Sequence, residues 1–114
     1  MNAVNPEIVN ESVDSNRAEF DIHVPADLYY LQGHFPGEPV LPGVIQVHWA
    51  IQLADEHFDL KPSFAGIEAL KFHRIIKPET TIKLALELNE ESGKLTFSYS
   101  STSGKHSQGR VLFE

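Results

Sequence analysis

Polar and apolar residues alternate with a period of two over much of the chain, which is typical of β-strands with one buried face. The first such run begins at Ala18, where apolar side chains alternate with Glu19, Asp21 and His23. Two later runs are separated by a Gly-containing turn and predict a hairpin. The predicted strands are 18–24, 64–76, 81–88, 94–100 and 107–113.

One segment departs from this alternation and predicts a helix. Within residues 44–54 only Gln46, His48 and Gln52 are polar. Because apolar residues occur all round this segment, we expect other parts of the protein to cover it. Pro42 suits the first helical turn, since its missing N–H would be unpaired there. One helix followed by antiparallel strands predicts an α+β domain, with a curved antiparallel sheet wrapped around a long central helix.

Length and composition limit the function classes. No repeat or linker interrupts residues 1–114, so a single domain is expected, with the polar residues 1–16 partly frayed. The net charge of −7 argues against nucleic acid or an anionic membrane as a partner. The absence of cysteine excludes disulfides and thiolate catalysis. Because there is neither a signal peptide nor a membrane-spanning apolar run, a cytoplasmic protein is expected.

Residues 33–43 carry His34 to the predicted helix start through a loop with three prolines and three glycines. Such residues restrict or specialise the backbone, so a histidine held there is a functional candidate as well as a possible cap. Gly43 begins the helix, where free N–H groups and the positive end of the dipole favour a polarised carbonyl. An ordinary Pro-Gly helix start is the alternative.

Two polar residues of the helix form a second candidate. His48 and Gln52 are four residues apart and therefore share a helix face. They could be hydrogen-bonded core residues, or His48 could share acid–base work with His34. The six histidines show no spacing typical of a metal site, so no metal is expected.

The one basic concentration in this acidic chain comprises Lys71, His73, Arg74 and Lys77. In a strand, Arg74 would lie on the face opposite to the other three. The cluster is either a solvated edge or a surface that recognises an acidic carrier or a phosphate group.

The loop at residues 33–43 resembles the signature loop of bacterial (3R)-hydroxyacyl-[acyl-carrier-protein] dehydratases of the FabZ and FabA type. Gln52, Lys71-Phe72, Arg74 and Pro78 extend the resemblance, which covers most of the chain. The short length and the position of Trp49 beside His48 are similar to divergent members, such as those of aryl-polyene pathways.

The resemblance implies a hotdog fold, at least a dimer, and an active-site tunnel at the subunit interface. It also implies that a 3-hydroxyacyl thioester on acyl carrier protein or coenzyme A is dehydrated to a trans-2-enoyl thioester, without metal or organic cofactor. His34 would be the base, and the Gly43 amide would polarise the thioester carbonyl. The positions expected to bind substrate are Tyr30, Phe35, Val40, Leu41 and Gln52, and those expected to dock the carrier are Lys71, Arg74 and Lys77.

The chain departs from this family pattern at His48, where the family has a helix carboxylate that assists the leaving hydroxyl. Gln52 follows at the expected spacing, so the register is kept and the acid is replaced. Three interpretations remain open. His48 serves as the acid; or the protein is a hotdog thioesterase in which His48 or Asp55 positions water; or it is a non-catalytic module that binds the acylated carrier.

Overall fold

The computed structural model describes residues 5–26 and 40–114, and in them the chain forms one helix and a single antiparallel sheet. The sheet order is β1-β2-β4-β5-β6-β3, so β1 and β3 are its edges. The elements are β1 (Glu7–Val13), β2 (Arg17–His23), α1 (Gly43–His57), β3 (Phe64–Phe72), β4 (Thr81–Asn89), β5 (Lys94–Ser101) and β6 (Gly104–Phe113).

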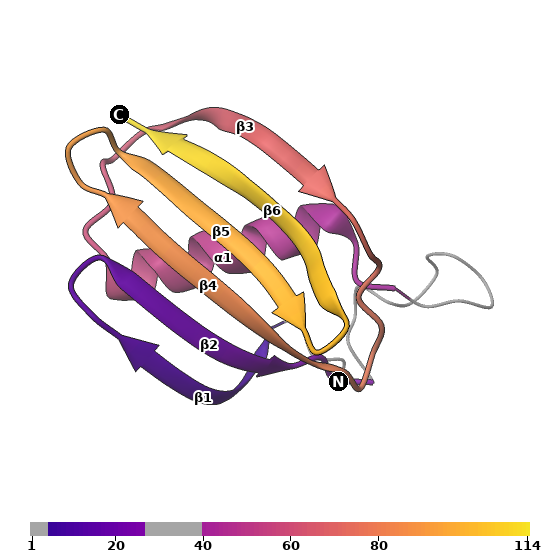
Figure 1. The fold of residues 1–114 in the computed structure, drawn as a ribbon. Coiled ribbons are helices and arrows are strands. Elements are labelled where there is room, and N and C mark those ends of the chain that lie inside the picture. Colours follow the sequence, from indigo (N-terminus) through magenta and orange to yellow (C-terminus); the bar gives the residue numbers. More distant parts are fainter. Residues whose placement is uncertain (1–4, 27–39) are drawn as a thin grey trace.

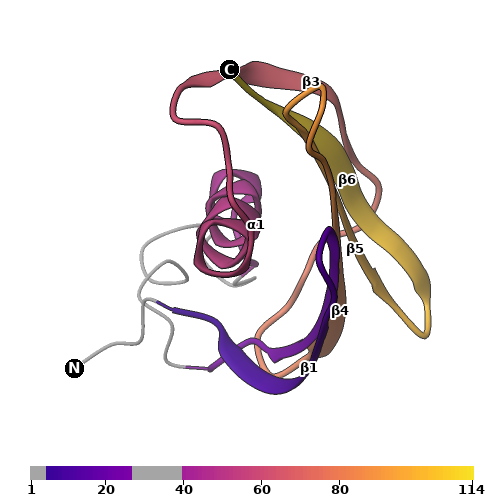
Figure 2. The same cartoon turned by 90° about the vertical axis from the view of Figure 1, so that its left-hand side faces the viewer.

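The sheet curves around α1, which lies along its concave side (Figures 1 and 2). The alternating apolar residues of β2, β4 and β5 face the helix and are buried, as their period-two pattern predicts. Trp49 and Phe97 are fully buried between the two layers. The hotdog architecture expected from the sequence is thereby confirmed.

The helix is covered on one side only within the described part of the chain. Its buried residues face the sheet, whereas Val44 and His48 on the opposite side are exposed, Val44 by 74%. The expectation that the whole helix is covered therefore does not hold for these residues. Helix α1 is not long and apolar enough to cross a membrane, and it is the only helix described.

The segment 1–16, expected to be partly frayed, contains a strand that the sequence did not predict, because Glu7–Val13 form β1. Ladder hydrogen bonds to β2 hold it, with a bulge between Ile8 and Asn10. Almost every residue of this edge strand is exposed, so burial imposes no apolar alternation by which the sequence could reveal it.

Strand β3 is shorter than the predicted extended segment 64–76 and ends at Phe72. Its register against β6 shifts between Glu68 and Lys71, where Ala69 has a φ of 54°. Because residues 73–77 leave the strand, alternation no longer assigns their faces. The expected placement of Arg74 opposite Lys71, His73 and Lys77 therefore has no basis in the structure.

Candidate functional site

The first turn of α1 presents free backbone donors. Pro42 is the N-cap and has no side chain that could cap the helix, and the first turn contains no acidic residue. The first helical hydrogen bonds run from the amides of Ile45 and Gln46 to the Pro42 carbonyl. Within the described residues the Gly43 amide has no acceptor. The positive end of the helix dipole is thus left available for an electronegative ligand atom.

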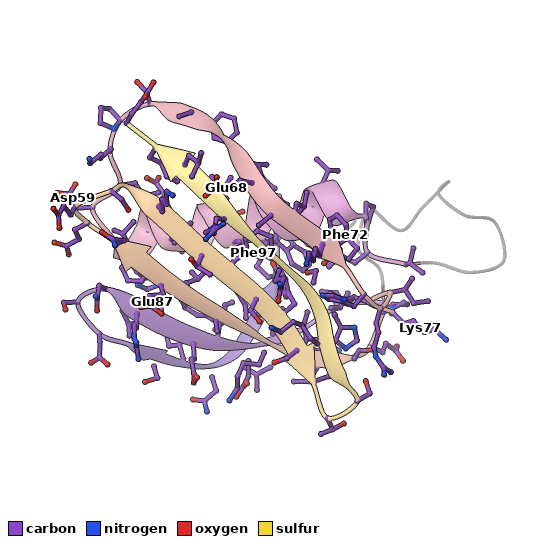
Figure 3. The ribbon with its side chains drawn as sticks, turned by 45° about the horizontal axis from the view of Figure 1, so that its top comes forward. Asp59, Glu68, Phe72, Lys77, Glu87 and Phe97 are labelled. Carbon is purple, nitrogen blue, oxygen red and sulfur yellow. The ribbon has the colours of Figure 1, made fainter. Side chains whose placement is uncertain are left out.

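An apolar pocket of about 330 Å³ lies at this helix start. Val40, Leu41 and Gly43 line it from the helix side, and Phe72 lines it from the end of β3. The Phe72 ring lies directly over Gly43: a Cβ built on Gly43 would be 2.6 Å from the ring's Cζ atom. Figure 3 shows Phe72 at this end of the molecule. A ligand placed here would lie beside Gly43 in largely apolar surroundings.

Gln46 fixes the position of this helix start. Its Nε2 donates to the Leu41 carbonyl over 3.1 Å, and its Oε1 accepts from the Ser107 hydroxyl over 2.7 Å. The Leu41 amide in turn donates to the Ile76 carbonyl. Both Gln46 and Ser107 are buried, so each depends on the other for hydrogen bonding. This network connects α1 to β6 directly beneath the apolar pocket.

Tyr99 of β5 adds a further connection to the helix. Its hydroxyl donates to the backbone carbonyl of Gln46 over 2.7 Å, and the side chain is fully buried. Burial raises the pKa of Tyr99 far above its ordinary value, because the phenolate would lose its hydration. Tyr99 therefore stays protonated in the folded protein and remains a donor.

Replacing Tyr99 with phenylalanine should lower the free energy of unfolding by about 1–1.5 kcal/mol at pH 8, where it removes one hydrogen bond. Above pH 10 the parent should lose about 1.4 kcal/mol of unfolding free energy per pH unit. The reason is that the raised pKa of Tyr99 allows only the unfolded tyrosine to ionise there. Tyr99→Phe lacks this loss. Urea unfolding at pH 8 and pH 11 should show the difference between the two proteins disappearing or reversing; a constant difference would contradict the argument.

His48 and Gln52 occupy the side of α1 turned away from the sheet. His48 is exposed, and Gln52 is partly buried with its Nε2 3.4 Å from Asn5 Oδ1. Neither residue lines the apolar pocket, so within one chain the structure does not bring them to the Gly43 amide. Tyr30, His34 and Phe35 lie outside the described residues.

The basic cluster predicted from the sequence lies beside the apolar pocket. His73 and Arg74 line that pocket, and Lys71 is exposed near the end of β3. Within the described residues, Lys71, Arg74 and Lys77 make no ion pair and no side-chain hydrogen bond. Their charges are therefore available to an external anion.

Sequence reasoning missed the positioning residues Gln46, Tyr99 and Ser107. Gln46 was visible as a polar residue in an apolar helix, which is a usable signal for a buried hydrogen-bond network. Tyr99 and Ser107 occupy ordinary strand positions, and nothing in their sequence context distinguishes them.

The comparisons with known proteins agree on one family. The sequence model of the ApeI-like family, described as ApeI dehydratase, matches residues 10–110. The chain is 36% identical over 92 residues to the 3-hydroxyacyl-[acyl-carrier-protein] dehydratase FabZ of Clostridium novyi, covering 75% of this chain and 65% of that protein. It is 33% identical to the FabZ of Oenococcus oeni, covering 72% and 64%. The chain thus spans just under two thirds of the length of these relatives.

Solved structures extend the match to nearly the whole fold. A chain of the dehydratase heterocomplex ApeI:P from Xenorhabdus doucetiae superposes with a TM-score of 0.89 at 29% identity, covering 96% of this chain and 97% of that one. An uncharacterized protein from Erwinia carotovora subsp. atroseptica gives a TM-score of 0.82 at 31% identity, with 94% of both chains covered. The chain therefore belongs to the ApeI-like family, as a divergent hotdog protein of the FabZ and ApeI type.

Proposed function

We propose that the protein dehydrates a 3-hydroxyacyl thioester, carried by an acyl carrier protein or coenzyme A, to the trans-2-enoyl thioester, and that it does so in the cytoplasm. The observation that carries this proposal is that Gly43 stands at the positive end of α1 and lines an apolar pocket, while its amide has no acceptor among the described residues. A thioester oxygen accepting from this amide would be stabilised as negative charge develops on it. Membership of the ApeI-like family supports the same reaction.

In the proposed reaction, His34 removes the proton from C2 of the substrate, and the C2–H electron pair moves onto the thioester oxygen to give an enolate. This electron pair then returns to form the new C2–C3 double bond. The C3–O bond breaks, and the departing hydroxyl takes a proton from His48 to leave as water. An imidazolium is a suitable donor at neutral pH, whereas a carboxylic acid needs a raised pKa to donate there. The active site needs no metal or organic cofactor for this step. Val40, Leu41, Tyr30, Phe35 and Gln52 are proposed to contact the acyl chain.

The proposed site takes its two histidines from different subunits. His48 lies outside the apolar pocket of its own chain, on an exposed helix face. Edge strand β3 exposes Phe64, Ile67 and Phe72, with Phe64 59% exposed, which supports pairing with a second chain along this edge. We propose a homodimer, or a larger assembly of such dimers. The ApeI:P structure is a heterocomplex, so a second related chain is the competing partner.

The test of this function is the product formed from a 3-hydroxyacyl carrier thioester. We expect the enoyl thioester to form. Its ultraviolet absorbance and mass spectrometry measure this product. Release of free thiol would identify a thioesterase instead. Binding of the acylated carrier without turnover of any chain length would identify a non-catalytic module.

His48 should be required for this reaction. We expect His48→Ala to lower the dehydration rate by about 10²–10³-fold, because the leaving hydroxyl loses its acid. His48→Glu should retain or exceed the parent's rate, since it restores the carboxylate of the family pattern. Asp55→Ala, at an exposed position further along the same helix, is the matched control and should have no effect. A fully active His48→Ala variant would exclude His48 as the acid.

A further inference from the structure

A second, more polar pocket adjoins the apolar pocket at the helix start. It is open, has a volume of about 600 Å³, and shares Arg74 and Ile75 with the apolar pocket as common walls. Its lining also includes Lys77, together with hydroxyl side chains at the start of β4 and around the β5–β6 turn. One elongated ligand could therefore occupy both pockets, with its apolar, carbonyl-bearing end at Gly43 and its other end here.

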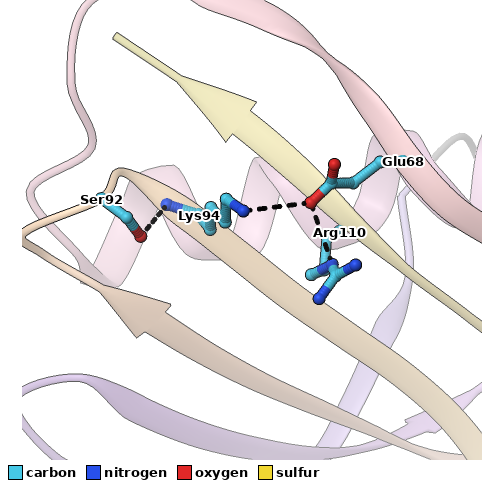
Figure 4. A network of polar contacts seen from close by, with 4 residues as sticks. All are labelled: Glu68, Ser92, Lys94 and Arg110. Carbon is cyan, nitrogen blue, oxygen red and sulfur yellow. Dashed lines mark hydrogen bonds and ion pairs between the residues drawn. The ribbon is translucent and has the colours of Figure 1, made fainter.

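Some cations of the chain are paired with a carboxylate, but within the described residues those of this second pocket are not. Glu68 pairs with Lys94 at 3.3 Å and with Arg110 at 3.1 Å, as Figure 4 shows. Arg74 and Lys77 make no such pair with any described carboxylate, although acidic residues outnumber basic ones in the sequence. Lys77 is labelled in Figure 3 at the same end of the molecule as Phe72. An unneutralised arginine and lysine on one pocket favour an anionic ligand.

His106 fixes the backbone that carries Arg74. Its carbonyl accepts from the amides of His73 and Arg74, over 2.8 and 3.1 Å, and its Nδ1 lies 3.0 Å from the Ile75 carbonyl. Since a carbonyl only accepts, Nδ1 carries the proton and donates. Three consecutive residues are thereby held against β6. The Arg74 guanidinium reaches over the β5–β6 turn, with its Nε 4.0 Å from a Cβ built on Gly104.

The same histidine organises hydroxyl groups on the other wall of the pocket. His106 Nε2 is 2.7 Å from Ser101 Oγ, which is 2.9 Å from Ser103 Oγ and also accepts from the Ser103 amide. With a neutral His106, Ser101 donates to Nε2 and is already satisfied as an acceptor by the Ser103 amide. The exposed Ser103 hydroxyl is then able to turn its proton to a ligand without leaving Ser101 unsatisfied.

We propose that this second pocket binds the phosphate of the pantetheine arm that carries the acyl group. Arg74 and Lys77 would neutralise the phosphate, and the Ser103 hydroxyl would donate to one of its oxygens. This inference rests on the proposed function, because it assigns the two joined pockets to the two ends of one acyl-pantetheine ligand. His106 is a positioning residue, which holds Arg74 and Ser101 without touching the ligand.

The experiment compares 4′-phosphopantetheine with pantetheine, so that it does not depend on turnover. Calorimetric titration of the full chain should show about tenfold tighter binding of the phosphorylated compound. Arg74→Gln/Lys77→Gln should abolish this preference, and salt should weaken it in the parent. Lys61→Gln/Lys94→Gln removes the same charge near the β4–β5 turn, at the opposite end of β5, and should retain the preference. Equal binding of the two compounds by the parent would overturn the proposal.

Kinetics separate the sources of the phosphate. The Arg74→Gln/Lys77→Gln variant should show about a tenfold higher KM, with little change in kcat, for both the carrier-bound and the coenzyme A thioester. Its KM for the acyl-pantetheine thioester, which lacks phosphate, should not change. A KM effect confined to the carrier substrate would assign the cations to the carrier's surface and overturn the phosphate site. A phosphate preference in binding without any dehydration would uphold the site and refute the proposed function.

Discussion

Replacing His34 with alanine is expected to reduce dehydration to the background rate, the largest effect of any single substitution in this chain. A positioned general base contributes about 10²–10⁴-fold to the rate of a reaction. Among the described histidines, only His73 lines the apolar pocket. The rate of enoyl formation measures the loss. His57→Ala, at the opposite end of α1 from Gly43, is the control and should stay active.

A second readout separates loss of the base from loss of the acid. In deuterated water the parent should exchange the C2 proton of the substrate, and His34→Ala should not. His48→Ala should lose dehydration more than it loses exchange, because proton removal at C2 still has its base. Undiminished exchange in His34→Ala would mean that another group removes the proton, and the assignment of His34 would be wrong.

The sequence predicted the parts of this fold that burial determines. Strands with an alternating buried face, such as β4 and β5, and the apolar helix α1 were identified near their observed positions. Strand β1 was missed because hydrogen bonding to β2 holds it while nearly all its side chains remain exposed. A period-two pattern indicates that one face of a strand is buried. It does not indicate backbone hydrogen bonding at an exposed edge of a sheet.

The site was less predictable than the fold for a different physical reason. The helix-start argument and the resemblance both singled out Gly43, and within the described residues its amide has no acceptor. The juxtaposition of Arg74, His106 and Ser101 depends on how the segment after β3 crosses the β5–β6 turn. Such contacts join residues far apart in sequence, and no local periodicity encodes them. Alternation could not assign a face to Arg74 either, because β3 ends at Phe72.

Gly43→Ala is expected to lower dehydration by about 10²-fold while leaving the fold intact. The added methyl group would lie beside the amide proposed to bind the thioester oxygen and would shift the carbonyl from it. Gly43 has no positive φ, so alanine suits its backbone, and the helix propensity of alanine is higher by about 1 kcal/mol. The three atoms nearest to the added methyl all belong to the far end of the half-exposed Phe72 side chain, which can move. Thermal unfolding should therefore change little.

A double-mutant cycle distinguishes a blocked amide from a displaced phenylalanine. If the methyl acts on the amide, Gly43→Ala should lower the dehydration rate by the same factor in a Phe72→Ala background as in the parent. If the displaced ring is the cause, Phe72→Ala alone should reproduce the loss, and the double variant should lose nothing more. We expect the first result, because the Gly43 N–H is the donor at which negative charge would develop in the transition state. The second would transfer the role from the helix start to Phe72, which would then be a residue that closes over the bound thioester.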